Sequence, residues 1–278
     1  MKEKLKSFVF NILKFSLLSS NKERQEEKLK EQLSKIVPDL STQYSTHVID
    51  MSDDYLVHKV RGQHAFQMSL ALKAIDFLKE KKSINLVDIG DSSGTHLIYL
   101  NNLRDDIDIN TLSVNLDPKA VDKIKAKGLN ALLCRAEELH LQENGIRADI
   151  FLSYEMLEHL FSPIEFLHTM SIKSECDFFV ITVPYVTKSR VALQFVKNEY
   201  EGDFAAENIH IFELSPEDWD LVFKFSGWEI VYRDKYTQYP KKFPLCLTKY
   251  LWRKLDFDGF YGVILKKNDT YSKRYLDW

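Results

Sequence analysis

After Lys82 the chain alternates short apolar runs with helix-forming stretches at the spacing of βαβ units, and no other feature limits its possible folds as strongly. The apolar runs predict strands at residues 84–89, 111–116, 131–134, 149–153, 177–183, 228–233 and 260–266. Helical patterns lie between most of them, at residues 96–103, 118–127, 162–174 and 215–226. Such alternation forms an α/β fold with a parallel sheet covered on both faces. The last two runs lack an obvious helix between them, which leaves room for an antiparallel pair at the sheet edge.

The first 82 residues have the pattern of a helical extension or cap that precedes an α/β domain of residues 83–278. Residues 21–35 are strongly charged and helix-prone, and Pro38 ends that stretch. Residues 50–82 form a second helical region with apolar residues at helical spacing. Within the α/β domain, an aromatic-rich insertion near residues 236–259 is a candidate lid, core or dimer surface.

Residues 1–20 combine lysines with apolar residues in a helical pattern. Phe8, Ile12 and Phe15 fall near one helical face, and polar residues interrupt the apolar stretch, which argues against a signal peptide. The favoured interpretation is a helix packed on its own domain or on a partner subunit. The alternative is peripheral contact with an anionic membrane at its inner face. No apolar run approaches the roughly 20 residues that a membrane span needs.

Charge and cysteine content argue against several classes of protein. The formal net charge of −3 over 278 residues provides no global attraction for a polyanion, so a nucleic-acid partner is not expected. Cys134, Cys176 and Cys246 are far apart and show no CxxC spacing. This argues against a disulfide framework or a structural zinc site and favours a reducing, cytoplasmic location.

The strand of residues 84–89 ends in an acid and leads into a glycine-containing turn, Asp88-Ile89-Gly90-Asp91-Ser92-Ser93-Gly94. Ligands of open α/β sheets bind beyond the carboxyl ends of the strands, where glycine lets the backbone approach closely. We expect Asp88 to accept hydrogen bonds from loop amides or from the ammonium group of a cofactor. The turn lacks a Gly-x-Gly pair, so the three-glycine dinucleotide fingerprint is not met.

The segment from Val87 to Gly94 resembles the first motif of class I S-adenosylmethionine (SAM)-dependent methyltransferases, an acid followed by alternating glycines. Ser92 stands where the middle glycine usually lies. That family has a Rossmann-like, seven-stranded, mostly parallel sheet whose last strand is antiparallel, in agreement with the predicted strands. The resemblance implies SAM as cofactor, bound by the turn residues Asp88, Gly90, Asp91, Ser92 and Gly94.

The same resemblance extends to the ends of the next strands. Aligning Pro118 with the family's usual proline puts Asn115 at the ribose position, where its single accepting oxygen is a weaker partner than a carboxylate. Asp117 is an alternative ribose contact, although Asp-Pro is also typical of a helix N-terminus. The remaining cofactor contacts that the resemblance implies are Leu116 beside Asn115, Ala136 and Glu137 at the adenine, Ser153 at the end of the fourth strand, and Arg61 at the cofactor carboxylate.

The segment Ser153-Tyr154-Glu155-Met156-Leu157-Glu158-His159-Leu160 resembles its counterpart in ubiquinone-biosynthesis O-methyltransferases. In a helical turn, Glu155, Glu158 and His159 would point the same way. Two acids and an imidazole suit a divalent cation such as Mg²⁺ or Mn²⁺.

His210, followed by Phe-Glu, resembles a histidine of small-RNA 2′-O-methyltransferases, which pair it with a Glu-x-x-Glu-His segment around one metal ion. This resemblance implies the ligands Glu155, Glu158, His159 and His210. The alternative is a site without metal, in which the Glu-His pair caps and packs a helix and His210 is a general base.

We therefore expect a SAM-dependent enzyme that methylates oxygen on a small-molecule or glycan acceptor, with His159 and His210 as catalytic residues and a divalent metal as an assistant. One alternative is an RNA 2′-O-methyltransferase, favoured by the Glu-x-x-Glu-His and His210 patterns. The other is a non-catalytic protein of methyltransferase fold that binds a partner, motivated by Ser92 and Asn115. Residues 185–200 are a candidate substrate lid.

Overall fold

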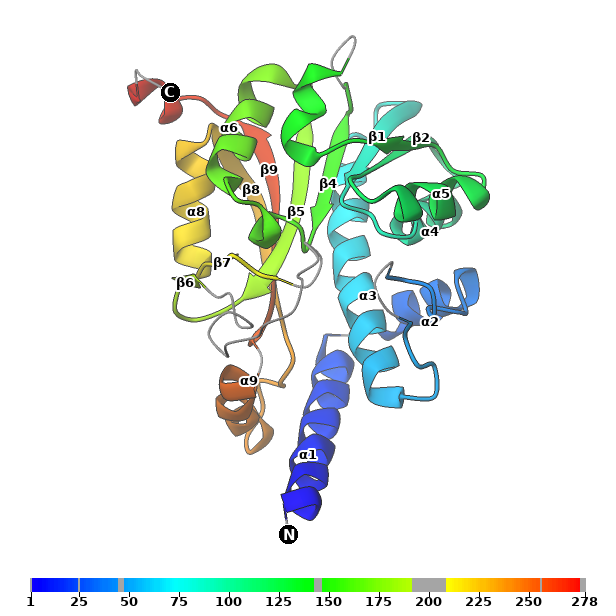
Figure 1. The fold of residues 1–278 in the computed structure, drawn as a ribbon, viewed down its shortest axis with the longest axis vertical. Helices are drawn as coiled ribbons and strands as arrows, with labels where there is room; N and C mark the ends of the chain where they lie inside the picture. The colour runs from blue at the N-terminus through cyan, green and yellow to red at the C-terminus, as the bar shows by residue number, and fades with distance from the viewer. Residues whose placement is uncertain are drawn as a thin grey trace.

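A seven-stranded sheet forms the centre of the molecule, in the computed structural model that describes residues 2–24, 26–44, 48–142, 147–191, 209–255 and 257–275 (Figure 1). The strand order is β3-β2-β1-β4-β5-β9-β8. The strands are β1 (Ser83–Ile89), β2 (Asp108–Asn115), β3 (Ala131–Leu133), β4 (Ile150–Tyr154), β5 (Phe178–Tyr185), β8 (Trp228–Thr237) and β9 (Gly259–Lys267). Strands β1 to β5 pair in parallel, and β9 is antiparallel to both β5 and β8. The predicted Rossmann-like, mostly parallel sheet is confirmed.

Helices cover both faces of this sheet, because neighbouring residues of each strand point to opposite sides. In β1, Leu86 belongs to one hydrophobic core and Val87 to the other. The first core includes residues of α3 (Asp54–Asp76) and α4 (Thr95–Leu103), and the second includes residues of α6 (Pro163–Lys173) and α8 (Pro216–Phe225). Helix α5 (Pro118–Ala126) follows β2 and contacts β2 and β3.

Local capping explains where two of these helices begin. Asp117 accepts a hydrogen bond from the backbone N–H of Lys119 at the start of α5, and Ser215 accepts one from Asp218 at the start of α8. A proline follows each cap, where its missing N–H costs nothing. The predicted starts of these helices therefore follow from side-chain chemistry that is visible in the sequence.

The N-terminal segment contains α1 (Lys2–Glu23) and α2 (Glu27–Ile36), and α1 packs on its own domain. Its buried face carries Leu13, Ser16 and Leu17, whereas Phe8 and Phe15 are exposed. Ser16 Oγ lies 2.6 Å from Thr248 Oγ1, next to the 3₁₀ helix and α9 (Lys249–Leu255) that follow β8. In the part of the chain that the structure describes, no helix is long and apolar enough to cross a membrane.

Candidate functional site

A cavity of about 520 Å³ lies at the carboxyl ends of β1, β2 and β4. The strand order reverses between β1 and β4, and such a switch point is where open α/β sheets bind ligands. Six predicted cofactor residues line the cavity: Gly90, Ser92, Asn115, Leu116, Ala136 and Glu137. The other five, Asp88, Asp91, Gly94, Ser153 and Arg61, are not among its lining residues.

The turn after β1 depends on two glycines with positive φ. Gly90 has a φ of +93°, and a Cβ at this position would lie 2.9 Å from Met156 Cγ. Gly94 has a φ of +72° at the start of α4, where a Cβ would lie 2.6 Å from Leu129 Cδ1. Both positions combine a left-handed backbone with close packing, so other residues would be strained there.

Asp91, rather than Asp88, holds the amides of this turn. Its Oδ1 accepts hydrogen bonds from Ser93 N at 3.0 Å and Gly94 N at 2.8 Å. The buried Asp88 instead pairs with His96 Nδ1 at 3.0 Å. Of the two partners expected for Asp88, the loop amides bond to Asp91 instead, because His96 on the first turn of α4 pairs with the Asp88 carboxylate. The contact with a cofactor ammonium group stays a prediction.

Burial and the nearby charge of Asp88 raise the pKa of Asp91 to about 6, against the opposing effects of His96 and the two amides. An acid whose pKa folding raises contributes stability below its ordinary value of 3.8, and loses that contribution as the pH rises toward 6. Asp91→Asn keeps the accepting oxygen and removes the buried charge. We expect its free energy of unfolding to rise, relative to the wild type, by about 1.4 kcal/mol between pH 5 and pH 8.

Urea titrations at the two pH values measure this difference, with the exposed Asp122→Asn as the control. A difference that stays constant or falls with pH would contradict the raised pKa of Asp91.

Ser92 and Asn115, the two departures from the family pattern, both stabilise the turn. Ser92 Oγ donates to the backbone oxygen of Gln43 at 2.7 Å, which ties the turn to the connection between α2 and α3. Asn115 Nδ2 donates to the backbone oxygen of Asp91 at 2.9 Å, and its Oδ1 accepts from Asp117 N at 2.8 Å. The amide of Asn115 therefore joins β2 to the turn, and the neighbouring carboxylate of Asp117 also lines the cavity.

Arg61 lies in a structural position away from the cavity. Its buried guanidinium donates to the backbone oxygens of Val37 and Pro38 at 2.6 and 3.0 Å, and to the hydroxyl of Tyr99 at 2.9 Å. These bonds fix the end of α2 against α3 and α4. The sequence pattern could not show this role, because the accepting carbonyls come from a different helix.

A second group of predicted residues meets beside the cavity. Ligand atoms of Glu158, His159 and His210 all lie within 4.8 Å of one another. Glu158 and His159 belong to a 3₁₀ turn after β4, and His210 precedes β7 (Phe212–Glu213), a short strand that pairs with β6 (Arg190–Val191). A backbone hydrogen bond of 2.7 Å from Ile211 N to Glu158 O holds the two segments together.

Each histidine is oriented through its Nδ1. His159 Nδ1 lies 2.7 Å from the carbonyl oxygen of Ile209, which only accepts, so this nitrogen carries the proton. His210 Nδ1 lies 2.9 Å from a carboxylate oxygen of Glu213. Burial opposes ionisation of Glu213, but the hydrogen bonds from His210 and Arg190 outweigh it and lower the pKa of Glu213. In the neutral rings, both Nε2 atoms are thus left with a lone pair.

Glu158 is fully buried, and neither of its carboxylate oxygens has a hydrogen-bond partner among the described residues. Burial, followed by the charges of Glu155 and Glu213, raises the pKa of Glu158 well above its ordinary value. His159 Nε2 lies 4.0 Å from Glu158 Oε1. Burying a carboxylate without hydrogen bonds is costly, and a cation in contact with it would offset that cost. Burial beside two oriented histidines is the pattern of a metal site whose ligands are held by outer hydrogen bonds.

Glu155 does not share this arrangement. It has a φ of +51°, in the left-handed region, and the 3₁₀ turn begins only at Leu157. The expected helical turn from Glu155 to His159 is therefore not formed, and Glu155 is outside the group whose ligand atoms lie together. Like His159, it lines the cavity. A residue held in this sparsely populated conformation next to a cavity is typical of functional sites.

No protein-family model matches the chain, and no curated protein matches it either. Solved structures resemble it at low sequence identity. The magnesium protoporphyrin IX methyltransferase of Synechocystis, solved with bound S-adenosylhomocysteine, is 10% identical with a TM-score of 0.52, over 86% of this chain and 93% of that one. The 1,6-didemethyltoxoflavin-N1-methyltransferase of Burkholderia thailandensis is 14% identical with a TM-score of 0.50, over 78% and 83%.

The fold is that of class I SAM-dependent methyltransferases. This fold is not restricted to methyl transfer, since the [4+2]-cyclase SpnF is 12% identical with a TM-score of 0.53, over 90% of this chain and 96% of that one. The fold therefore does not determine the reaction, which depends on the residues of the site.

Several residues of the site were not predicted from the sequence. Glu213 orients His210, and its signal was present in the Phe-Glu that follows the histidine. Cys134, Arg135 and Phe161 line the cavity without any pattern that would have identified them. Part of the candidate lid lies outside the described residues, which end at residue 191 and resume at residue 209.

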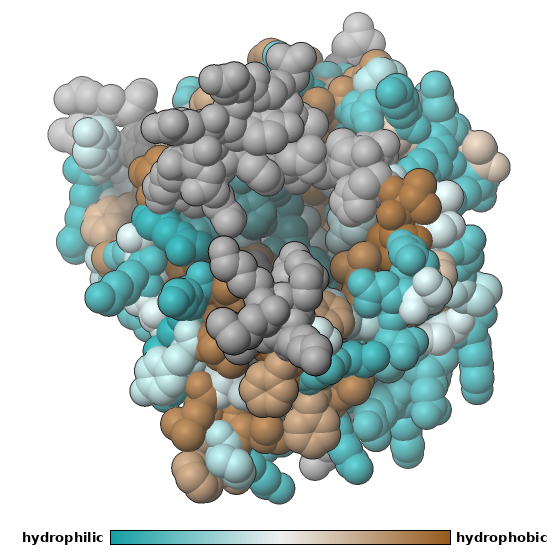
Figure 2. All heavy atoms as spheres, turned by 60° about the horizontal axis from the view of Figure 1, so that its bottom comes forward, coloured by the Kyte–Doolittle hydropathy of each residue, from teal (hydrophilic) through white to brown (hydrophobic). Residues whose placement is uncertain are grey.

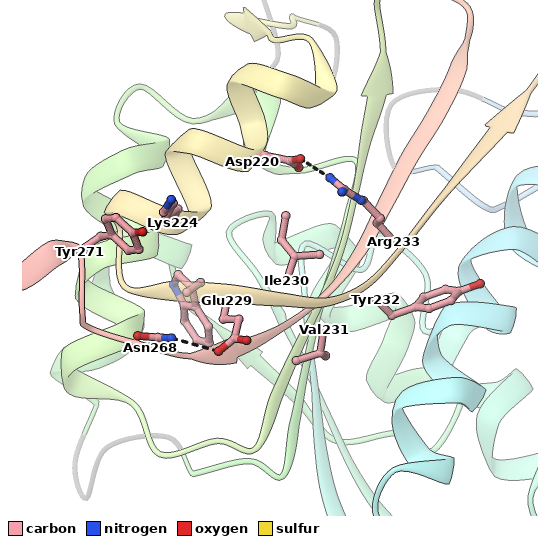
Figure 3. A pocket seen from close by; sticks show the side chains of 10 residues that line it. Asp220, Lys224, Glu229, Ile230, Val231, Tyr232, Arg233, Asn268 and Tyr271 are labelled. Atoms are coloured by element: carbon pink, nitrogen blue, oxygen red, sulfur yellow. Dashed lines mark hydrogen bonds and ion pairs between the residues drawn. The ribbon is translucent and has the colours of Figure 1, made fainter.

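A larger cavity, of about 620 Å³, lies on the edge strand β8 and next to α8 (Figure 3). Its polar side chains already pair with one another: Arg233 with Asp220, Asn268 with Glu229, and the ammonium of Lys224 with the ring of Tyr271. It does not lie at the carboxyl ends of the parallel strands. The cavity at the turn after β1 is therefore the better candidate for the cofactor.

Proposed function

We propose that this protein is a SAM-dependent O-methyltransferase for a small-molecule or sugar-containing acceptor, assisted by a divalent cation at Glu158, His159 and His210. The observation that carries the proposal is the position of this group. Its member His159 lines the same cavity as Gly90 and Asn115. Cofactor contacts and a proton-accepting group thus share one space, as transfer to oxygen requires.

The residues around the cavity fit a nucleoside cofactor. Gly90 has no Cβ, so the turn packs directly against Met156, and both residues line the cavity. Asp117 and Glu137 provide carboxylates for hydroxyl groups, and Met156 and Leu160 provide apolar surface for a base. SAM carries a methyl group that its sulfonium already activates, so the protein has only to align an acceptor and remove a proton.

The residues of the second group fit a divalent cation. Glu158 supplies a buried carboxylate without a hydrogen-bond partner among the described residues, and His159 and His210 supply two oriented Nε2 atoms. Carboxylate and imidazole together suit Mn²⁺ or Mg²⁺. A bound cation would lower the pKa of an acceptor hydroxyl and hold it in position. The proton of that hydroxyl would then pass to water, because an Nε2 atom that binds the cation has no lone pair left for it. In a site without a cation, the Nε2 atoms of His159 and His210 would instead be the bases that accept the proton.

Titration calorimetry with S-adenosylhomocysteine tests the cofactor assignment, and we expect a one-to-one complex. Absence of binding would overturn both enzyme interpretations and favour a non-catalytic binding protein. Methyl transfer to a panel of hydroxylated small molecules and glycan intermediates, compared with 3′-end RNA, tests the acceptor. Transfer to RNA alone would overturn the proposed acceptor class in favour of a 2′-O-methyltransferase.

A further inference from the structure

One end of the molecule exposes six large apolar side chains. Two come from α1 and the others from the segment between β8 and β9, and each is between 50% and 80% exposed. We call them the α1–α9 surface: Phe8, Phe15, Phe243, Leu247, Tyr250 and Leu255. Figure 2 looks onto this end of the molecule and shows apolar residues gathered in the lower part of the view. Apolar side chains that cluster in this way usually mark an interaction site.

The two halves of this surface form one packed unit. Ser16 on α1 contacts Thr248 Oγ1 at 2.6 Å and accepts from Trp252 Nε1 at 3.3 Å. Ser16 also donates to the backbone oxygen of Gln238, and Lys241 N donates to Glu23 at the end of α1. The inner face of α1 therefore packs against its own domain. The phenylalanines on its outer face remain exposed because nothing else in the described chain covers them.

Basic residues outnumber acidic ones in both segments at this end. Helix α1 contains five lysines and two glutamates, and residues 241–258 contain five basic and two acidic residues. Lys14 pairs with Asp54, and Arg253 pairs with Asp258. The whole chain has a formal net charge of −3, so the rest of the molecule carries the excess of acidic residues. Aromatic side chains interspersed with lysine and arginine are the composition of surfaces that lie in an anionic lipid interface.

The segment that carries α9 leads to the candidate site. Phe257 lies two residues beyond the end of α9, and its ring centroid is 6.4 Å from that of His210. In Figure 1, β4 and β5 point toward the end of the molecule where α1 and α9 lie. A group bound at the α1–α9 surface therefore lies at the same end of the molecule as the carboxyl ends of β4 and β5.

We propose that the α1–α9 surface docks the protein on an anionic membrane. A second copy of the chain fits less well, because an isologous contact would bring two strongly basic surfaces together. Anionic lipid headgroups complement the lysines and arginines, and the acyl region accepts the phenylalanines. Docking would present an acceptor carried by a lipid to the site at His159 and His210. This consequence rests on the proposed function.

Cosedimentation with vesicles tests docking without cofactor or acceptor, so its outcome does not depend on methyl transfer. We expect binding to vesicles of phosphatidylcholine and phosphatidylglycerol in equal amounts to be at least about tenfold tighter than to phosphatidylcholine alone, and to weaken with salt. Phe8→Ser/Phe15→Ser should weaken binding about tenfold or more, since it removes two exposed apolar anchors. Lys241→Glu/Lys242→Glu should remove the preference for anionic vesicles.

Ile172→Ser/Lys173→Glu is the matched control, because both residues are exposed on α6 at the opposite end of the molecule (Figure 1). Thermal melting of each variant checks that it remains folded. No binding to anionic vesicles, or equal losses in the control, would overturn the proposal. Concentration-dependent self-association that Phe8→Ser/Phe15→Ser abolishes, without vesicle binding, would overturn it in favour of a dimer surface.

Discussion

Glu158→Gln is expected to lower the rate of methyl transfer by about 100-fold or more, the range in which positioned acid–base and metal assistance contribute. Glutamine has nearly the shape of glutamate but no negative charge, so it cannot hold a cation beside His159 and His210. The affinity for S-adenosylhomocysteine should stay within about twofold, because Glu158 does not line the cavity proposed for the cofactor. Single-turnover rates and calorimetry on the same preparations measure both quantities.

Melting temperatures measured with and without Mn²⁺ distinguish cation binding by Glu158 from a merely structural role of this residue. We expect Mn²⁺ to raise the melting temperature of the wild type, by an amount that corresponds to about 2.7 kcal/mol at 100 times its dissociation constant. Glu158→Gln should remove this rise, and the exposed Glu165→Gln on α6 should retain it. An unchanged rate together with an unchanged response to Mn²⁺ would contradict the proposed cation site.

Gly90→Ala is expected to weaken the binding of S-adenosylhomocysteine by roughly 10- to 100-fold, the equivalent of the 1–3 kcal/mol that overpacking costs. The new Cβ would lie 2.9 Å from Met156 Cγ, and both residues line the cavity proposed for the cofactor. Either Met156 moves into the cavity or the turn shifts away from β4. Calorimetry measures the affinity, and urea unfolding measures the stability of the same variant.

Gly128→Ala provides a matched control for backbone strain. Gly128 also has a positive φ, of +79°, but a Cβ there would meet nothing within 4 Å. Both variants should lose about 1–2 kcal/mol of stability from the left-handed backbone. Only Gly90→Ala should lose affinity, and an equal loss in Gly128→Ala would show that global destabilisation, not the cavity, is responsible.

The sheet and its helices were predictable because their signals are local. Strands buried on both faces appear as continuous apolar runs, as at Leu86 and Val87, which supply opposite cores. Helix starts at Asp117-Pro118 and Ser215-Pro216 follow from capping by neighbouring residues. The grouping of Glu158 and His159 with His210 was also predicted, although fifty residues separate the segments, because each carries a recognisable pattern of its own.

The sequence did not predict which of several possible hydrogen-bond partners a polar side chain contacts. Asp88 and Asp91 are three residues apart, and only the position of His96 in the folded turn decides which of them holds the loop amides. The guanidinium of Arg61 donates hydrogen bonds to backbone carbonyl groups of another segment. Such choices depend on which donors and acceptors reach each other after burial, and the sequence does not specify those distances.

The sequence by itself determined the α/β class, the order of the elements and the starts of several helices, because periodicity, capping and turn residues act over a few positions. The tertiary structure alone decided three other features. It held Glu155 in a left-handed conformation outside the group of Glu158, His159 and His210, packed α1 through Leu13 and Leu17, and left Phe8 and Phe15 exposed beside α9. Each of these depends on burial against distant elements, which no local pattern encodes.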